Sequence, residues 1–370
     1  MRHPTMDFVN INDYKRAAEQ NVSKMGFDYI IGGSLDELTL KRNSDAFRNI
    51  LLKQHVLRDV SNISLNTEVL GFPLKYPIII GPVSLHQLSH PRGEIETAEA
   101  VEEAGTIMTL SSLSSTSMED VAKASSATKW FQLYWYKDRE LTKSMVERAE
   151  NSGYKAICLT VDAPVLGHRE KDSYNRFTLP EDVKLRNYEN LVQESFQSDD
   201  EAESGLAKYV FSQFDSSINW KNLDWLTGLT NLPIIIKGVQ TSQDAKKCLD
   251  YHIQGIVVSN HGGRQLDNSL STIECLPRVT AVVGDQMDVM IDSGIRRGSD
   301  IFKSIALGAK AVLLGRAYIW GLGARGKEGV IGVLEILQKE LTETMALTGC
   351  KSISEISSEY LEEETIPRYK

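Results

Sequence analysis

The sequence of 370 residues has few cysteines, no long hydrophobic run and no excess of basic residues, and each shortage excludes a class of protein. The four cysteines lie far apart without a Cys-x-x-Cys pair, which argues against a disulfide framework or zinc cluster and is typical of a reducing compartment. No apolar run approaches the roughly 20 residues that span a bilayer. The net charge of −9 argues against nucleic acid and anionic membranes as partners.

The histidines show no His-x-x-x-His or facial-triad spacing, so no metal site is expected. The first residues contain no apolar core of a signal peptide, and the chain does not end in a peroxisomal Ser-Lys-Leu signal. A cytoplasmic location is the resulting expectation.

From residue 76 the sequence alternates short β-rich runs with helical spacers. Most of the β-rich runs are almost continuously apolar, which is typical of strands buried on both faces of a parallel sheet. The predicted strands are residues 77–80, 106–110, 130–134, 156–161, 233–236, 255–258, 288–291 and 311–314. This α/β pattern favours a (β/α)8 TIM barrel over an open doubly wound sheet, because no Gly-x-Gly-x-x-Gly follows the first strand.

We expect one domain over residues 1–370, with a mainly helical N-terminal extension (1–75), a barrel (76–320) and a C-terminal helix and tail (321–370). The loop after strand 4 is unusually long, at roughly seventy residues against about 2–6 for an ordinary connection. It contains an acidic stretch at residues 198–205 and is either a linker or an active-site lid; its origin at the catalytic end of the barrel favours the lid.

The sixth predicted strand runs directly into Ser259-Asn260-His261-Gly262-Gly263-Arg264. A histidine can take up a proton near neutral pH, and an arginine can bind a carboxylate through two parallel hydrogen bonds. The alternative is a polar loop with a capping histidine, but a His-Gly-Gly-Arg run at the end of a strand favours chemistry.

Active sites of (β/α)8 barrels lie at the carboxyl ends of the strands. The residues predicted there include several cations, and buried charges are costly without partners, so we expect a large anionic ligand. Gly294-x-Arg296-Arg297-Gly298 and Gly315-Arg316 follow strands seven and eight, where such barrels often bind phosphate. Residues 27–33 are expected to form an apolar turn, in which Tyr29 taken alone is a packing residue.

The segment Ser259–Gln265 resembles the signature of the FMN-dependent α-hydroxy acid oxidases and dehydrogenases, and the resemblance is nearest to glycolate oxidase (2-hydroxy acid oxidase). It extends over nearly the whole chain. The other matching segments are residues 106–112, 131–134, 159–164, 175–177 and 232–239.

The resemblance implies roles at the substrate side of the site. His261 matches the base that removes a proton from the substrate, and Asp162 the carboxylate that orients this histidine. Arg169 and Arg264 match the pair that binds the substrate carboxylate. Tyr29 and Tyr134 match tyrosines that hydrogen-bond the substrate, which replaces the packing interpretation of Tyr29.

The resemblance also implies an FMN cofactor. Lys237 matches the cation beside the flavin ring, and Asp292 the contact to the ribityl chain. The positions that match further contacts to the ring are Val83, Ser84, Ser111, Gln132, Thr160 and Ser259. Those that match the phosphate site are Gly294, Arg296, Gly315 and Arg316.

Three positions depart from the pattern of the family. Leu113 stands where glycolate oxidase has a tryptophan over the substrate, which predicts a roomier, more apolar pocket. Ser84 replaces a small alanine or glycine beside the flavin, with a possible effect on access of oxygen. Ser293 replaces the first glycine of the usual Asp-Gly-Gly.

The implied function is oxidation of a small (S)-2-hydroxy acid to a 2-oxo acid, with oxygen as electron acceptor and hydrogen peroxide as product, by a homotetramer. One alternative is a dehydrogenase that passes electrons to a quinone or a carrier protein. Two others are an FMN-binding barrel without turnover and an aldolase-like barrel in which Lys237 would form a Schiff base.

Overall fold

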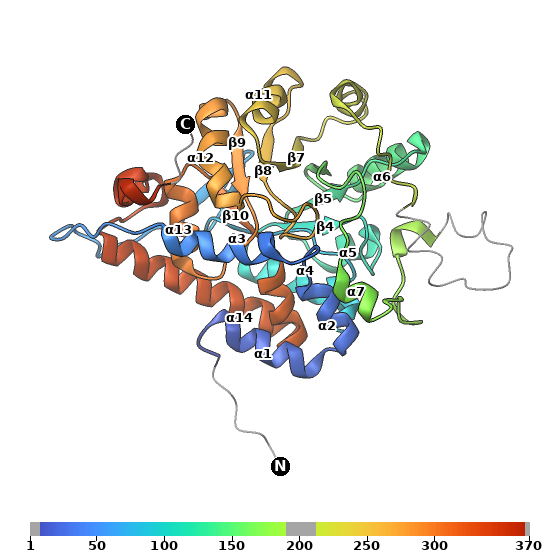
Figure 1. The fold of residues 1–370 in the computed structure, drawn as a ribbon, viewed down its shortest axis with the longest axis horizontal. Coiled ribbons are helices and arrows are strands. Elements are labelled where there is room, and N and C mark those ends of the chain that lie inside the picture. The colour runs from blue at the N-terminus through green and yellow to red at the C-terminus, as the bar shows by residue number, and fades with distance from the viewer. Residues whose placement is uncertain (1–7, 190–211, 367–370) are drawn as a thin grey trace, which may run out of the picture.

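The computed structural model describes residues 8–189 and 212–366, and its centre is a closed barrel of parallel strands surrounded by helices (Figure 1). Neighbouring strands follow the order β3 to β10, and β10 pairs with β3 to close the barrel. The strands are β3 (Ile78–Ile80), β4 (Met108–Ser111), β5 (Lys129–Leu133), β6 (Ile157–Thr160), β7 (Ile234–Val239), β8 (Gly255–Val258), β9 (Asp288–Ile291) and β10 (Ala311–Leu314). The predicted (β/α)8 barrel is therefore confirmed.

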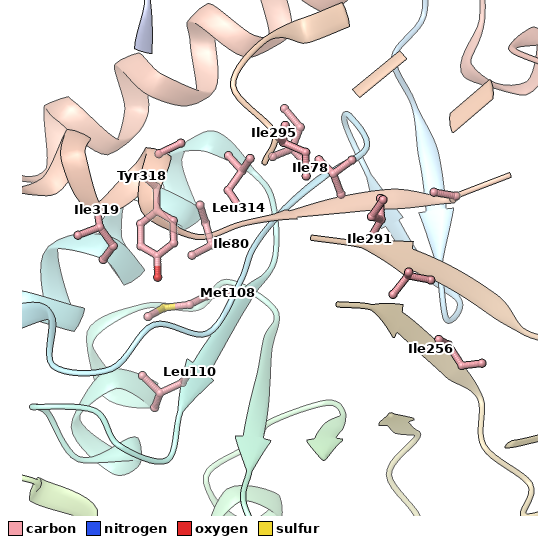
Figure 2. Close-up of a cluster of buried hydrophobic side chains, with 14 of the residues drawn as sticks. Ile78, Ile80, Met108, Leu110, Ile256, Ile291, Ile295, Leu314, Tyr318 and Ile319 are labelled. Carbon is pink, nitrogen blue, oxygen red and sulfur yellow. The ribbon is translucent and has the colours of Figure 1, made fainter. Parts of the chain in front are cut away.

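The apolar runs are explained by burial on both faces of the sheet. Ile79 packs inside the barrel in one cluster with Trp130 and Val257, whereas Ile78 and Ile80 belong to the outer cluster between strands and helices. Figure 2 shows part of this outer cluster, with Ile80 near Tyr318 and Ile319 of the C-terminal helix and Ile78 beside Ile295. Alternation along each strand thus fills two separate cores, and both faces of the sheet are buried.

Twelve α-helices are assigned in the part of the chain that the structure describes. They are α1 (Ile11–Asn21), α2 (Lys24–Ile31), α3 (Leu38–Asn49), α4 (Gly93–Ala104), α5 (Met118–Ala124), α6 (Arg139–Asn151), α7 (Glu170–Tyr174), α10 (Leu223–Thr227), α11 (Ser242–Asp250), α12 (Thr272–Val283), α13 (Gly298–Ala306) and α14 (Arg316–Thr348). The predicted C-terminal helix starts earlier than expected, because α14 follows β10 directly and bends at Arg325 and Gly326, whose backbone angles are not helical. None of these helices is both long enough and apolar enough to cross a membrane.

The N-terminal extension differs from the expectation in two places. Residues 27–31 are not a turn but the second half of α2, which begins at the capping side chain of Ser23 and ends at Gly32. Between α3 and the barrel lies an antiparallel hairpin of β1 (Thr67–Val69) and β2 (Phe72–Leu74), which the sequence analysis did not predict. Val69 and Leu74 pack into the inner cluster of the barrel, so this hairpin contributes to the barrel core.

The long loop after strand 4 is partly described. Its beginning contains α7, and its end contains α10, which leads into β7. The acidic stretch 198–205 lies outside the described residues, so the lid remains a prediction.

Candidate active site

A cavity opens at the carboxyl ends of the barrel strands, as predicted. Its lining includes most of the residues expected to hold substrate and cofactor. These are Tyr29, Val83, Ser84, Ser111, Gln132, Tyr134, Thr160, Lys237, His261, Arg264, Asp292, Gly294, Arg296, Gly315 and Arg316. Eight separate strands and helix α2 thus bring to one cavity residues that lie far apart in the sequence.

Four predicted residues do not line this cavity. Asp162 and Ser259 lie directly behind it, hydrogen-bonded to lining residues. Arg169 pairs with Asp172 at 3.1 Å, and its guanidinium lies 5.2 Å from the centre of the Tyr29 ring. Leu113 is buried, with its backbone N–H donating to Ser111 Oγ, so its predicted contact with substrate has no support from the lining.

His261 and Asp162 form a hydrogen-bonded pair between Nδ1 and Oδ1 at 3.0 Å. Burial alone would raise the pKa of Asp162, but the adjacent His261 and Lys237 hold the pKa below its usual value, so the carboxylate stays charged. With Nδ1 engaged, Nε2 is the ring nitrogen that can exchange a proton with a ligand. The pair has the arrangement of a general base with its orienting carboxylate.

The backbone around His261 is held in an unusual conformation. His261, Gly262 and Gly263 all have positive φ angles, of 58°, 68° and 73°. A Cβ atom at Gly262 would lie 2.5 Å from Arg316 Nη1, and one at Gly263 would lie 2.5 Å from the backbone N of Leu40. The two glycines therefore allow the histidine loop to pack against Arg316 and α3 at the same time.

Two arginines of the cavity hold the C-terminal end of α2. Arg264 Nη1 donates to the carbonyls of Tyr29 and Gly32 at 2.7 and 2.9 Å. Arg316 donates from Nε to the Ile30 carbonyl at 3.0 Å and from Nη2 to the Gly32 carbonyl at 2.7 Å. A helix C-terminus carries partial negative charge and attracts cations, so these bonds fix the helix that presents Tyr29.

The arginines are only partly neutralised by the protein. Burial and the neighbouring Arg169 lower the pKa of Arg264 to about 10, and burial lowers the pKa of Arg296 to about 10. Burial, Arg264 and Arg296 lower the pKa of Arg316 well below its usual value. Mutually repelling cations around one cavity indicate an anionic ligand, in agreement with the sequence analysis.

Lys237 lies at the end of β7 in a buried network. Its Nζ donates to Ser259 Oγ at 2.9 Å and pairs with Asp292 Oδ2 at 3.0 Å. Burial would lower the pKa of Lys237, but Asp292 and Asp162 raise it above its usual value. A lysine held in the charged form is a poor nucleophile, which argues against the aldolase-like alternative.

Ser293 explains how the departure from Asp-Gly-Gly is accommodated. Its φ angle is 75°, so it adopts the left-handed conformation that a glycine would adopt easily. Its Oγ accepts a hydrogen bond from Gly262 N at 3.0 Å and donates to Asp292 Oδ1 at 2.7 Å. The serine thereby links the histidine loop to the carboxylate that pairs with Lys237.

The two tyrosines are fixed by aromatic stacking. Tyr29 stacks on Phe177 with ring centres 4.6 Å apart, and Tyr134 stacks on Phe214 at 4.4 Å. Burial, Asp162 and Tyr29 raise the pKa of Tyr134, so its hydroxyl stays neutral and can donate a hydrogen bond. Both phenols lie where the expected substrate contacts would be; their roles remain predictions.

Residues outside the predicted set hold the site together. Asn43 of α3 and Asn260 of the histidine loop form a reciprocal pair of buried amide hydrogen bonds at 2.9 and 2.7 Å. Gln265 connects this loop to the loop after β6, because its side chain bonds the carbonyls of Asp162 and Val165 and the N–H of Gly167. Gln265 stands in the matched signature, but Asn43 carries no local signal that could have revealed it.

The residues present fit an FMN. Gln132 Nε2 is buried at the cavity without a hydrogen-bond partner among the described residues, so a ligand acceptor is required. The carbonyl and ring-nitrogen edge of an isoalloxazine provides such acceptors. Gly294 and Gly315 lie just before α13 and α14, where backbone N–H groups with Arg296 and Arg316 suit a phosphate.

The part of the chain that the structure describes contains no candidate set of metal ligands. Within residues 8–189 and 212–366, no group of three or more His, Cys, Asp or Glu side chains is arranged to hold an ion.

Comparison with known proteins places this geometry in a family. The profile of the family described as FMN-dependent dehydrogenase matches residues 18–363. L-lactate oxidase of Nostoc sp. is 45% identical over 357 residues, covering 95% of this chain and 98% of its own. Glycolate oxidase of Spinacia oleracea is 44% identical over 356 residues, covering 96% of both chains. The crystal structure of a soluble mutant of the membrane-associated (S)-mandelate dehydrogenase from Pseudomonas putida has a TM-score of 0.89 at 40% identity, covering 96% of this chain and 99% of that one. The chain belongs to the FMN-dependent dehydrogenase family, and its cofactor is FMN.

Proposed function

We propose that the protein oxidises a small (S)-2-hydroxy acid to the corresponding 2-oxo acid, with oxygen as final electron acceptor and hydrogen peroxide as product. The observation that carries this proposal is the His261–Asp162 pair, whose histidine lines the same cavity as Arg264 and Gln132. The Nε2 of Gln132 has no hydrogen-bond partner among the described residues. A base, a cation that can bind a carboxylate and a hydrogen-bond donor for the flavin are thus combined in one cavity. The named relatives include L-lactate oxidase and glycolate oxidases, which supports this class of reaction.

The chemistry divides between cofactor and side chains. A bound FMN would supply the two-electron redox chemistry of the reaction, with oxygen as the proposed final acceptor. Arg264, helped by Arg169, would bind the substrate carboxylate, and Tyr29 and Tyr134 would donate hydrogen bonds to substrate oxygens.

His261 is the residue that would transfer the proton. Its Nε2 would take the proton that the substrate loses, and Asp162 would stabilise the imidazolium that results. Lys237 would supply positive charge to the flavin ring, while Arg296 and Arg316 would hold the phosphate.

The alternative acceptor is a quinone or a carrier protein, as in a dehydrogenase. The specific observation in its favour is the similarity to (S)-mandelate dehydrogenase structures. A barrel that binds FMN without turnover is disfavoured, because pure binding does not need a base oriented by a carboxylate.

One experiment tests the proposal and separates the two acceptors. The yellow protein is mixed anaerobically with glycolate, lactate, mandelate or a long-chain 2-hydroxy acid, and loss of visible flavin absorbance is followed; oxygen is then admitted. We expect fast reduction by at least one acid and fast reoxidation with release of hydrogen peroxide. Fast reduction followed by slow reoxidation would favour the dehydrogenase, and no reduction by any acid would favour the barrel without turnover.

We also infer a cytoplasmic homotetramer. All four cysteines are free and buried, which is compatible with a reducing compartment. Light scattering on the purified holoprotein tests the assembly, and cell fractionation tests the compartment.

A further inference from the structure

Ser84 makes a contact in the cavity that the expected roles do not include. It follows β3, lines the cavity and is partly buried. Its Oγ lies 2.7 Å from the hydroxyl of Tyr29, which comes from α2, 55 positions earlier in the sequence. This is the hydrogen bond that the structure gives to the Tyr29 hydroxyl, and it joins two elements that face the ligand.

The surroundings of Tyr29 determine what its hydroxyl can do. The guanidiniums of Arg169 and Arg264 lie 5.2 and 5.1 Å from the ring centre, and Phe177 stacks on the ring. Cations cannot accept a hydrogen bond. A carboxylate that binds these arginines would bring acceptor oxygens close to the phenol.

The direction of the Ser84–Tyr29 bond therefore matters. If Tyr29 donates to Ser84, its only O–H is used and cannot reach the ligand. If Ser84 donates to Tyr29, the phenol O–H remains free to donate, and its donor strength increases because bonds in a chain polarise one another. A carboxylate only accepts hydrogen bonds, so a Tyr29 hydroxyl that bonds the ligand carboxylate requires the second arrangement.

We propose that Ser84 is a positioning residue of the substrate site: its hydroxyl donates to Tyr29 and directs the Tyr29 O–H towards the bound hydroxy acid. The inference rests on the proposed function for the identity of the ligand, but the contact itself does not depend on turnover. A side chain without a hydroxyl, such as the alanine or glycine expected at this position, cannot make this contact. Ser84 would thus tune the affinity of the site for a carboxylate.

A double-mutant cycle tests the proposal in the FMN-loaded protein. Wild type, Ser84→Ala, Tyr29→Phe and the double variant are titrated with oxalate, followed by the change in visible flavin absorbance. Oxalate is a suitable probe because it has adjacent carboxylates but no α-hydrogen to lose. Ser84→Ala should weaken binding about fivefold in the wild-type background and less than about twofold in the Tyr29→Phe background. Ser84→Thr should restore binding to within about twofold of wild type.

Several outcomes would overturn the proposal. One is an equal loss of oxalate affinity from Ser84→Ala in both backgrounds. The others are no loss of oxalate affinity in the wild-type background and no oxalate binding to the wild-type holoprotein. Equal FMN content of the four proteins confirms that the comparison concerns the substrate site.

Kinetics separate positioning from access of oxygen. With a 2-hydroxy acid that reduces the flavin, Ser84→Ala should raise KM about fivefold while the limiting rate of anaerobic reduction changes less than about twofold. A change confined to reoxidation by oxygen would refute the positioning role. If no 2-hydroxy acid reduces the wild type, the proposed function fails, but oxalate titration still decides the role of Ser84.

Discussion

Lys237 and Asp292 form a buried ion pair at the end of the barrel, with Nζ and Oδ2 3.0 Å apart and side-chain exposures of only 5% and 14%. Ser259 Oγ bridges the two, because it accepts from Lys237 and donates to Asp292. Removing one charge of such a pair leaves the other buried and unpaired, which is more costly than removing both.

Lys237→Met should therefore lower the free energy of unfolding by about 3–5 kcal/mol and slow anaerobic flavin reduction. The double variant Lys237→Met/Asp292→Asn should regain most of the stability but not the reduction rate. Urea unfolding measures the first effect. Lys327→Met, which breaks the exposed pair with Glu103, is the control and should cost less than about 1 kcal/mol. Equal stability of the single and double variants would contradict this account.

Gly238 allows β7 to pass close to the side chain of Asp162. Its φ angle is 117°, and a Cβ atom there would lie 2.7 Å from Asp162 Cβ. Gly238→Ala should displace Asp162, reduce stability by more than about 2 kcal/mol and slow flavin reduction. Gly153→Ala is the matched control, because Gly153 also has a positive φ angle of 82° but nothing within 4 Å of its added Cβ. Gly153→Ala should lower the free energy of unfolding by only about 1 kcal/mol and leave the rate of flavin reduction unchanged. Equal effects of the two substitutions would exclude the contact with Asp162 as the cause.

His261→Asn removes the expected base without removing contacts to the phosphate site. The rate of anaerobic flavin reduction should fall by about 10²–10⁴-fold, while the protein remains yellow. Stopped-flow absorbance measures the rate. His252→Asn changes an exposed histidine beyond the N-terminal end of β8 and should leave the rate unchanged. A rate close to that of wild type in His261→Asn would remove the histidine from its role.

Arg296 offers a test of the phosphate site that does not involve turnover. Arg296→Met should weaken FMN binding by more than about tenfold and leave the binding of riboflavin, which lacks the phosphate, almost unchanged. Titration of the apoprotein by flavin fluorescence quenching gives both affinities. Arg297→Met, next in the chain but half-exposed and paired with Glu340, is the control for a general effect on the loop. Equal weakening for both flavins would place Arg296 outside the phosphate site.

Glu274 predicts a pH dependence of stability. Burial would raise its pKa, but hydrogen bonds from Arg42 and Ser271 lower the pKa from 4.5 to about 2. The carboxylate therefore stabilises the fold above pH 4.5, and this contribution is lost as the pH falls towards 2. Glu274→Gln should cost about 1–2 kcal/mol at pH 7, with the difference from wild type shrinking between pH 4.5 and 2.

Urea unfolding at several pH values measures this difference. Glu343→Gln changes an exposed pair, with Lys339 at 3.9 Å, and should have little effect at any pH. If the loss of unfolding free energy in Glu274→Gln does not vary with pH, the shape of the side chain and not its charge stabilises the contact.

The barrel could be predicted from sequence because its signal is local. The strand β8 is four apolar residues that continue directly into the signature loop, and the same pattern occurs in the other barrel strands. The hairpin of β1 and β2 was missed because its strands have three residues each, and its turn places Leu70 in a left-handed conformation that usually indicates glycine or asparagine. Helix α2 could not be told from a turn, because its short apolar run is followed directly by Gly32 and Gly33.

The residues of the site could be named from the resemblance, but their contacts could not. The bonds of Arg264 and Arg316 to the end of α2 join residues more than 200 positions apart, and nothing in the local sequence indicates them. The same holds for the amide pair of Asn43 and Asn260. The role of Leu113 beside the substrate stays a prediction, because its side chain is buried and does not line the cavity.

The bonds from Arg264 and Arg316 to α2 have a thermodynamic consequence. The guanidiniums that would bind the anionic ligand also hold the last turn of this helix. Ligand binding in the cavity is therefore coupled to local unfolding of residues 24–33. Ligands that neutralise these cations should slow hydrogen exchange at the backbone amides of α2. Hydrogen exchange in helix α2 would therefore report whether the cavity is occupied.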